Sequence, residues 1–258
     1  MLRTPFYKPD HKMPFSFDLD ARSALFLDFD GTLVDIASTP DAVSVAPGLT
    51  DMLHRLAGAL DGALALISGR PLEQLDRFLS PLVLPAAGVH GAERRRPDGV
   101  VERRALPALE RVAALALRLA AQHPGLLVER KVSAVALHYR AAPELEASCR
   151  DAMAQAVEGE PSLHVMHGKM VLEALPRGVS KGHAVDAFLR EPPFAGRRPV
   201  FIGDDVTDEA GFEAVQRAGG LAVRVGDGPS IATHQLPNPA AVRGWLARQL
   251  DVVAAAAH

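Results

Sequence analysis

Several residue types are scarce in this chain, and each shortage excludes something. The 258 residues include a single cysteine, Cys149, so no disulfide can form within the chain, which fits a reducing compartment. Cys149 lies in a polar stretch of helical pattern with no evident catalytic partner, so we interpret it as an inert thiol. Aromatic residues make up only 5% of the chain, which leaves few rings for stacking against a ligand.

Long apolar runs and an excess of one charge are also missing. No stretch approaches the ~18 apolar residues of a membrane span, and the first 18 residues mix charges with prolines. We therefore expect no signal peptide, no membrane partner and a cytoplasmic protein. The formal net charge is −3, and acidic residues are interleaved with the arginines of residues 93–104. That segment predicts a solvated hairpin, and we expect no nucleic-acid partner.

The apolar content, 48% of the residues, is enough for a packed core, and its pattern changes along the chain. Over residues 23–89, and again after Pro176, apolar runs of strand length alternate with segments of helical spacing. This pattern is typical of a parallel sheet with crossover helices. The stretch between them predicts helix, extended segment, helix and strand pair. We therefore predict an α/β fold with a core formed by residues 1–102 and 176–258 and an inserted α+β domain formed by residues 103–175.

The segment LFLDFDGTL, residues 25–33, ends an apolar run in two aspartates. Residues two apart in an extended segment point to the same side, so Asp28 and Asp30 could face one site beyond the strand. Neighbouring carboxylates repel, and a sequence keeps both most readily where a cation or the chemistry needs them. Gly31 allows a sharp turn at this point, and Thr32 adds a hydroxyl.

A second acidic cluster follows the apolar run of residues 199–202, where Asp204 and Asp205 are followed closely by Asp208. In one parallel sheet both clusters would emerge at the same edge. Mg²⁺ prefers oxygen ligands and would offset the repulsion among these carboxylates, so we expect Mg²⁺ as the cofactor. Either cluster alone could be a polar turn, and only the pair favours a metal site. No zinc site is expected, because no pair of histidines has a metal-motif spacing.

Two further residues carry groups suited to an anion. Ser68 follows a short apolar run and could offer a hydroxyl and backbone N–H groups to a phosphate, or could only cap the next helix. Lys181 begins a helix, where the helix dipole disfavours a cation. It could face the acidic site and hold a phosphate, or it could be a solvated surface lysine.

These residues, in this order, resemble the four motifs of the haloacid dehalogenase-like phosphatases, and the resemblance covers the chain from about Ser23 onward. It implies a Rossmann-like core in which Asp28 is the nucleophile and Asp30 the general acid and base. Ser68 and Lys181 would stabilise the charge on the transferring phosphoryl oxygens. A carboxylate is already ionised at neutral pH, so Asp28 would need no base to activate it.

The same resemblance implies a ligand set for the metal. Mg²⁺ would be held by the side chain of Asp28, the backbone carbonyl of Asp30 and the side chain of Asp204. Asp205 or Asp208 would reach it directly or through water.

Three stretches in and around the inserted domain narrow the resemblance from this superfamily to one family within it. Gly88–Glu93, Glu129–Arg140 and His167–Gly182 are similar to the trehalose-6-phosphate phosphatase family. The family resemblance implies that the insert is a cap that closes over the sheet edge and holds the glucose hydroxyls. Alternatively, the charged residues of the insert have no binding role: they are solvated at the ends of strands, or they form an exposed ion pair that contributes little to stability. The expected substrate-binding residues are Lys131, Arg140, Lys169 and Glu173 in the cap, with Thr32, His90 and Gly91 in the core.

We therefore predict a phosphomonoester hydrolase, a monomer, that uses Mg²⁺ to release trehalose and phosphate from trehalose 6-phosphate, a small-molecule substrate. Two alternatives remain open. One is a capped phosphatase or phosphomutase acting on another sugar phosphate, and the other is a non-enzymatic sugar-phosphate sensor. The intact Asp28, Asp30, Lys181 and Asp204 argue against a sensor, and a panel of sugar phosphates separates the two enzymes.

Overall fold

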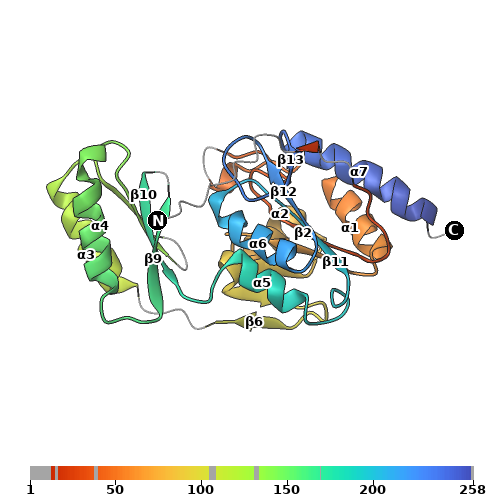
Figure 1. Cartoon of the computed structure of the whole chain (residues 1–258), viewed down its shortest axis with the longest axis horizontal. Coiled ribbons are helices and arrows are strands. Elements are labelled where there is room, and N and C mark those ends of the chain that lie inside the picture. Colours follow the sequence, from red (N-terminus) through yellow and green to blue (C-terminus); the bar gives the residue numbers. More distant parts are fainter. Residues whose placement is uncertain are drawn as a thin grey trace, which may run out of the picture.

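The chain folds into two bodies, a larger one with a nine-stranded sheet and a smaller one with a four-stranded sheet (Figure 1). The computed structural model describes residues 13–14, 17–37, 40–104, 109–130, 134–168 and 170–256. The smaller body is inserted between β6 (Val101–Arg103) and α5 (Lys181–Phe188), so the chain leaves the larger body and returns to it.

The centre of the large sheet is parallel. The neighbouring strands β12, β11, β2, β3 and β4 all run in one direction, and β5 and β6 complete one edge as an antiparallel hairpin. All five residues of β2 are buried, which is why its last four residues form a continuous apolar run rather than an alternating one. In order across the sheet the strands are β1 (Met13–Pro14), β13 (His234–Leu236), β12 (Leu221–Val225), β11 (Arg198–Gly203), β2 (Ser23–Leu27), β3 (Leu64–Ile67), β4 (Ala86–Gly88), β5 (Glu93–Arg95) and β6 (Val101–Arg103).

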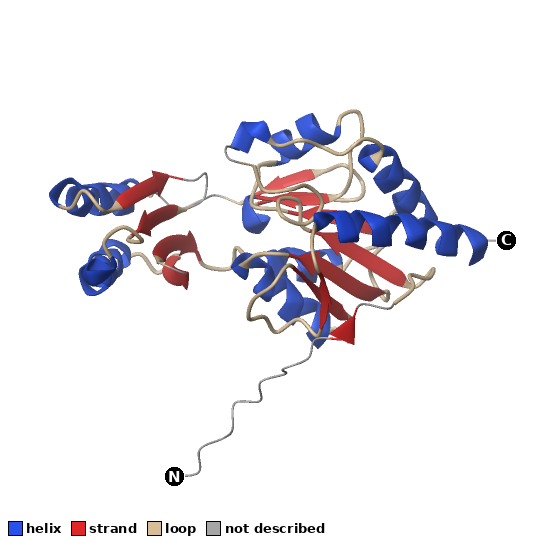
Figure 2. Ribbon diagram, turned by 90° about the horizontal axis from the view of Figure 1, so that it is seen from above, coloured by secondary structure: helices blue, strands red, loops and turns tan. Residues whose placement is uncertain are grey.

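Helices cover both faces of this sheet (Figure 2). α1 packs with α7 on one face and α5 packs with α6 on the other, so apolar residues of the strands are buried on both sides. The rings of Phe26, Phe188 and Phe194 meet in this core, with centroids 5.0–6.1 Å apart. The helices are α1 (Leu49–Ala59), α2 (Leu72–Leu79), α5 (Lys181–Phe188), α6 (Glu209–Arg217) and α7 (Pro239–Ala256).

The smaller body is an antiparallel sheet with helices on one face. Leu137 and Leu172 point toward the helices and form part of a second core, separate from the first. The opposite face of the sheet is turned toward the larger body (Figure 1). Its elements are α3 (Glu110–Gln122), β7 (Leu127–Arg130), β8 (Val135–His138), α4 (Glu146–Val157), β9 (Leu163–Gly168) and β10 (Val171–Pro176), with the strands in the order β7-β8-β10-β9.

The predicted α/β fold with an inserted α+β unit is confirmed, and a few elements differ in detail. The apolar run of residues 82–89 forms a strand only over Ala86–Gly88, and residues 126–140 hold two antiparallel strands rather than one extended segment. The expected domain limits at residues 102 and 175 each fall one residue before the end of a strand, β6 and β10. Within the described part of the chain, no helix is both long and apolar enough to span a membrane.

Candidate active site

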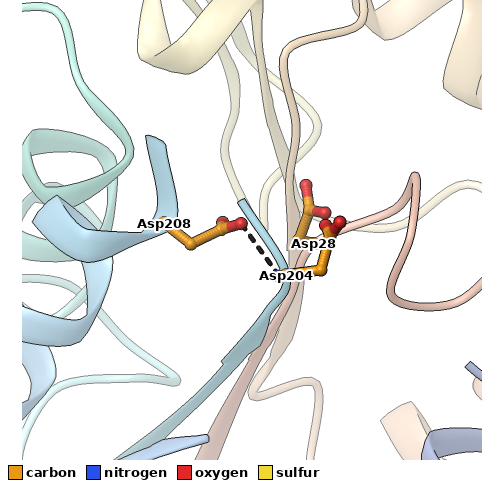
Figure 3. Close-up of side chains that lie close together, drawn as sticks. All are labelled: Asp28, Asp204 and Asp208. Atoms are coloured by element: carbon orange, nitrogen blue, oxygen red, sulfur yellow. Dashed lines mark hydrogen bonds between the residues drawn. The ribbon is translucent and has the colours of Figure 1, made fainter. Parts of the chain in front are cut away.

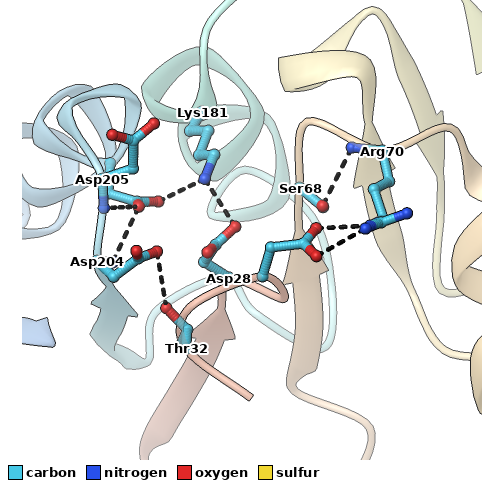
Figure 4. A network of polar contacts seen from close by, with 9 residues as sticks. Asp28, Thr32, Ser68, Arg70, Lys181, Asp204 and Asp205 are labelled. Carbon is cyan, nitrogen blue, oxygen red and sulfur yellow. Dashed lines mark hydrogen bonds and ion pairs between the residues drawn. The ribbon is translucent and has the colours of Figure 1, made fainter. Parts of the chain in front are cut away.

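Four neighbouring strands place the candidate residues at one edge of the large sheet. Asp28 follows β2, Asp204 follows β11, Ser68 follows β3 and His90 follows β4. Because β11, β2, β3 and β4 are parallel neighbours, their carboxyl ends meet at this edge (Figure 4). Lys181 reaches the same place from the first residue of α5.

A buried charge network lies at the centre of this edge. The Nζ of Lys181 donates to Oδ1 of Asp28 and to Oδ1 of Asp208, both at 2.7 Å. All three side chains are at most 5% exposed. Burial alone would lower the pKa of Lys181, but Asp208 and Asp28 outweigh it, and the pKa is raised above its ordinary value. Lys181 is therefore a permanent cation in the site and not a solvated surface lysine.

The carboxylates outnumber that cation. Oxygen atoms of Asp28, Asp204 and Asp208 all lie within 4.8 Å of one another (Figure 3). Burial, with the neighbouring charges of Asp208 and Asp205, raises the pKa of Asp204 to about 6. Burial likewise raises the pKa of Asp28 and of Asp208, against the opposing effect of Lys181. Three acids lie together and the one ammonium bonds to only two of them, so they form an oxygen-lined site that a hard divalent cation would stabilise.

Asp208 orders the loop that carries the second cluster. Its Oδ2 accepts from the backbone N–H groups of Asp204 and Asp205, at 3.1 and 2.9 Å, while its Oδ1 accepts from Lys181. The side chain of Asp205 caps the start of the short helix Val206–Asp208. Both oxygens of Asp208 are thus engaged within the protein, and Asp204 is the residue of this loop that lies beside Asp28 (Figure 3).

Arg70, which the sequence analysis did not assign to the site, holds the second aspartate of the first motif. Its Nε and one terminal nitrogen donate to the two oxygens of Asp30 at 2.6 and 2.8 Å. Its other terminal nitrogen donates to Gln74 at 3.0 Å, and its backbone N–H donates to Oγ of Ser68 at 3.1 Å. The signal that could have found it is a cation two residues after Ser68, at the end of a strand.

Gly31 and Thr32, the turn residues that follow Asp30, pack against Asp204 of the second acidic cluster. Gly31 has φ +74°, and a Cβ at this position would clash with the carboxylate of Asp204. Thr32 is fully buried, and its hydroxyl is 3.5 Å from Oδ1 of Asp204. Glycine is therefore required where the two loops meet, and Thr32 contacts the acidic cluster rather than the open space above it.

His90 and Gly91 lie in a strained turn after β4. Val89 and His90 both have positive φ, 51° and 55°, which is rare for residues with a side chain. The amides of these two residues donate to the carbonyls of Arg70 and Ser68, both at 3.0 Å, so the turn is fixed to the Ser68 loop. The imidazole of His90 faces the site, whereas Gly91 packs against the start of α5.

A cleft of about 730 Å³ opens above these groups, between the two bodies. Its floor includes Asp28, Asp30 and Lys181, and β7 of the smaller body adds Glu129 and Arg130. Of the predicted cap residues, Glu173 is buried in an adjoining pocket, and Arg140 is exposed just after β8. Lys131 and Lys169 lie outside the described residues.

The fold and this edge of the sheet define a class. A parallel sheet with two aspartate loops, a serine loop and a buried lysine at its carboxyl edge, beneath an inserted α+β body, is the architecture of the haloacid dehalogenase-like phosphatases. Solved structures of that class share the fold: a phosphatase from Bacteroides thetaiotaomicron aligns over 97% of this chain and 100% of that one with a TM-score of 0.59, at 13% identity.

Comparison with known sequences gives the family. The sequence model described as trehalose-phosphatase matches residues 26–238. A probable trehalose-phosphate phosphatase of Sinorhizobium fredii is 48% identical over 242 residues, which is 92% of this chain and 91% of the relative. The trehalose-6-phosphate phosphatase of Escherichia coli is 45% identical over 231 residues, 89% of this chain and 87% of the relative. The chain belongs to the trehalose-phosphatase family.

Solved structures agree with this assignment. A trehalose-6-phosphate phosphatase of Aspergillus fumigatus is 28% identical, with a TM-score of 0.67 over 90% of this chain and 93% of that one. The C-terminal domain of the Candida albicans trehalose-6-phosphate phosphatase has a TM-score of 0.75 over 90% of this chain and 93% of that one. At 24% identity it supports the fold alone. The predicted family is thus confirmed.

Proposed function

We propose that this protein hydrolyses trehalose 6-phosphate to trehalose and inorganic phosphate, with Asp28 as the nucleophile and Mg²⁺ as the cofactor. The observation that carries the proposal is the buried contact between Asp28 and Lys181 at the floor of the cleft, in a chain of this family. We further propose that it acts as a monomer in the cytoplasm, and that residues 103–175 form the cap that selects the substrate.

The reaction proceeds in two displacements. A carboxylate oxygen of Asp28 attacks phosphorus, an Asp–O–P bond forms, and the bond between phosphorus and the sugar oxygen breaks. Asp30 gives a proton to the leaving sugar oxygen. Water then attacks the phosphorus of the aspartyl-phosphate, Asp30 takes its proton, and phosphate leaves as the carboxylate of Asp28 is restored.

Lys181 and Ser68 stabilise the charge on the phosphoryl oxygens during both displacements. Lys181 already contacts Asp28, so it lies beside any phosphoryl group that Asp28 attacks. Arg70 fixes the direction of the Asp30 carboxylate through two hydrogen bonds. Asp30 must turn from Arg70 toward the leaving oxygen when substrate is bound.

The donor set fits Mg²⁺. The acids around Asp204 have raised pKa values and are all oxygen ligands, as a hard cation requires. Asp28, Asp204 and the backbone carbonyl of Asp30 would hold the ion, and Asp205 or Asp208 would contribute directly or through water. When bound, Mg²⁺ supplies positive charge that polarises the phosphoryl oxygens.

The cap supplies the groups that bind the sugar. We assign this role to Lys131, Arg140, Lys169 and Glu173, with His90 from the core. Glu173 is buried on the cap face turned toward the core, which supports its part in the assignment. Charged donors and acceptors suit a hydroxyl-rich disaccharide, and such a site rejects ligands that lack those hydroxyls.

Phosphate release from a panel of sugar phosphates tests the proposal. The purified protein with Mg²⁺ should hydrolyse trehalose 6-phosphate at least tenfold faster than glucose 6-phosphate or sucrose 6-phosphate, an order of magnitude within reach of hydroxyl recognition. Removing Mg²⁺ with a chelator should abolish release, and adding it back should restore it. Equal rates on all three esters would contradict the substrate assignment, and a phosphorylated product would indicate a mutase.

A further inference from the structure

A second, smaller pocket of about 190 Å³ adjoins the cleft. It lies between β9 and β10 of the smaller body and the start of α5 and α6 of the larger one. His90, Lys181 and Thr207 line both the pocket and the cleft, so the two are adjoining compartments of one site. A substrate whose phosphate lies at Asp28 can therefore extend past Lys181 into this pocket.

His164 is the residue of interest in the pocket. Leu163 and Val165 pack into the core of the smaller body, so strand alternation places His164 on the opposite face of β9. That face is turned toward the larger body, and His164 lines the pocket there. In the register of β9 and β10, His164 lies opposite Leu175, two positions along from Glu173.

One ring nitrogen of His164 lacks a hydrogen-bond partner within the described part of the chain. Its Nδ1 is buried and has no hydrogen-bond partner among the residues that the structure describes. A buried imidazole nitrogen without a partner is unfavourable, and native proteins keep few such atoms unless something else satisfies them. A ligand hydroxyl is suited to this atom, because a hydroxyl can both donate and accept and so matches either tautomer of the ring.

The remaining walls of the pocket have the character of a small-molecule site. Met166 and Leu175 form an apolar wall from the cap, and Val206 and Ala210 face them from the core. These apolar walls face polar groups that include His164, Glu173 and Lys181, and pockets that orient a ligand combine apolar walls with placed polar groups in this way. The volume equals that of about six water molecules, enough for a hydroxyl-bearing part of a sugar and too small for a protein segment.

We propose that His164 is a specificity-determining residue, whose Nδ1 hydrogen-bonds a sugar hydroxyl remote from the phosphorus. The inference rests on the proposed function, since it concerns how that same substrate is selected. His164 takes no part in bond making or breaking. It acts beside Glu173, which lines the same pocket, and together they select a sugar with hydroxyls at two positions along the pocket.

The test compares a sugar phosphate with an ester that carries no sugar. In His164→Leu, KM for trehalose 6-phosphate should rise about tenfold, the usual effect of losing one buried hydrogen bond. The kcat/KM for p-nitrophenyl phosphate should stay the same, which also shows that the variant is folded. His164→Asn carries an amide near the position of Nδ1 and should regain most of the lost affinity.

His167→Leu is the matched control. His167 lies in the same strand, three residues away and on the opposite face, and it is exposed. Neither substrate should be affected by this change. A selectivity for trehalose 6-phosphate over p-nitrophenyl phosphate that is unchanged in His164→Leu would overturn the inference and leave the proposed function intact. Equal losses on both esters would also overturn it, by showing a structural role.

Failure of the proposed function has a different signature. A wild-type protein that hydrolyses p-nitrophenyl phosphate but not trehalose 6-phosphate would contradict the substrate assignment. The same comparison, made with the sugar phosphate that the wild-type protein does hydrolyse, then decides the role of His164.

Discussion

Single charged residues set the chemistry of the site, and they do so in pairs. Lys181 bridges Asp28 and Asp208, and Arg70 holds both oxygens of Asp30. The first motif therefore contains two aspartates in different environments, one beside a buried ammonium and one beside a guanidinium. This difference suits the two proposed roles, a nucleophile beside Lys181 and a proton carrier that turns from Arg70 toward the substrate.

Asp204 makes the stability of the metal-free protein depend on pH. Its pKa is about 6 in the folded protein, against an ordinary value of 3.8, so the folded state binds more protons between these values. Protonated Asp204 therefore adds to the free energy of unfolding below pH 3.8, and this addition is lost as the pH rises through about 6. In the presence of a chelator, Asp204→Asn should have the Tm of the wild type near pH 4 and a higher Tm at pH 7.

Saturating Mg²⁺ should reverse that order, because the ion stabilises only the wild-type carboxylate. The measurement is thermal unfolding of both proteins across the pH range, with and without Mg²⁺. A Tm difference between the two proteins that does not change with pH would contradict the account of Asp204.

Arg70 should act as a positioning residue for Asp30. Arg70→Lys keeps the charge but cannot form the two parallel hydrogen bonds, so kcat should fall by about tenfold or more while KM changes little. Arg77→Ala is the control. The guanidinium groups of Arg70 and Arg77 both lie over the ring of Phe78, but Arg77 pairs with the exposed Asp41 and not with Asp30. An Arg70→Lys enzyme with the kcat of the wild type, or one in which KM changes as much as kcat, would refute this role.

Some of the side chains in the site could be predicted from the sequence, and others could not. The two aspartate clusters and Lys181 could be placed because each follows or begins an element with a clear apolar pattern. The pairing of Arg70 with Asp30 joins residues 40 positions apart, and no local pattern encodes which acid that guanidinium meets. Thr32 is a similar case, since its contact with Asp204 depends on how two loops pack.

At the scale of the element, the loops after β2 and β11 approach so closely that a glycine must separate them. Gly31→Ala would place a methyl group in the carboxylate of Asp204 and impose a backbone penalty of about 1–2 kcal/mol at positive φ. Phosphatase activity and the stabilisation by Mg²⁺ should both be lost. Gly48→Ala is the matched control, because Gly48 has φ +79° and nothing within 4 Å of the added atom.

Gly48→Ala should lose stability by a similar backbone penalty and keep its activity, as measured by denaturant unfolding and phosphate release. If the two variants lost activity equally, the close contact between the loops would not explain the need for glycine.

Most elements were predictable because their apolar periodicity is clear, as in Leu49–Ala59. The short strands β1 and β13 were not, since two or three residues carry no periodic signal and are fixed by pairing with distant segments. The run of residues 82–89 was predicted too long as a strand because Pro85 and its neighbours are apolar but only Ala86–Gly88 pair with β3 and β5.

At the scale of the whole molecule, the cleft between the two bodies determines what can reach Asp28. Two connecting segments join the bodies, and Arg104 of the first donates to the carbonyl of Gly178 of the second at 2.7 Å. The cap lies over the carboxyl edge of the sheet, where its movement would enclose a substrate and exclude water. The insertion itself was predictable from the change in sequence pattern, but the way the cap faces the cleft was not, because it depends on these two connections.

Binding of substrate should therefore make the molecule more compact. Small-angle X-ray scattering of Asp28→Asn with Mg²⁺ should show a smaller radius of gyration when trehalose 6-phosphate is added, because the sugar contacts the cap and the phosphate contacts the core. Inorganic phosphate alone, which reaches only the core, should produce little change. A radius of gyration that does not respond to trehalose 6-phosphate would contradict closure of the cap.

The most direct measurement of the central claim is the location of the phosphoryl group during a single turnover. Wild-type protein mixed with trehalose 6-phosphate and Mg²⁺ and quenched in acid should carry phosphate on Asp28, detected by mass spectrometry of its peptide. Asp28→Asn should carry none, should release phosphate at least about a thousandfold more slowly, and should unfold at a Tm no lower than the wild type. Label at another residue, or phosphate release by Asp28→Asn at the wild-type rate, would contradict the account.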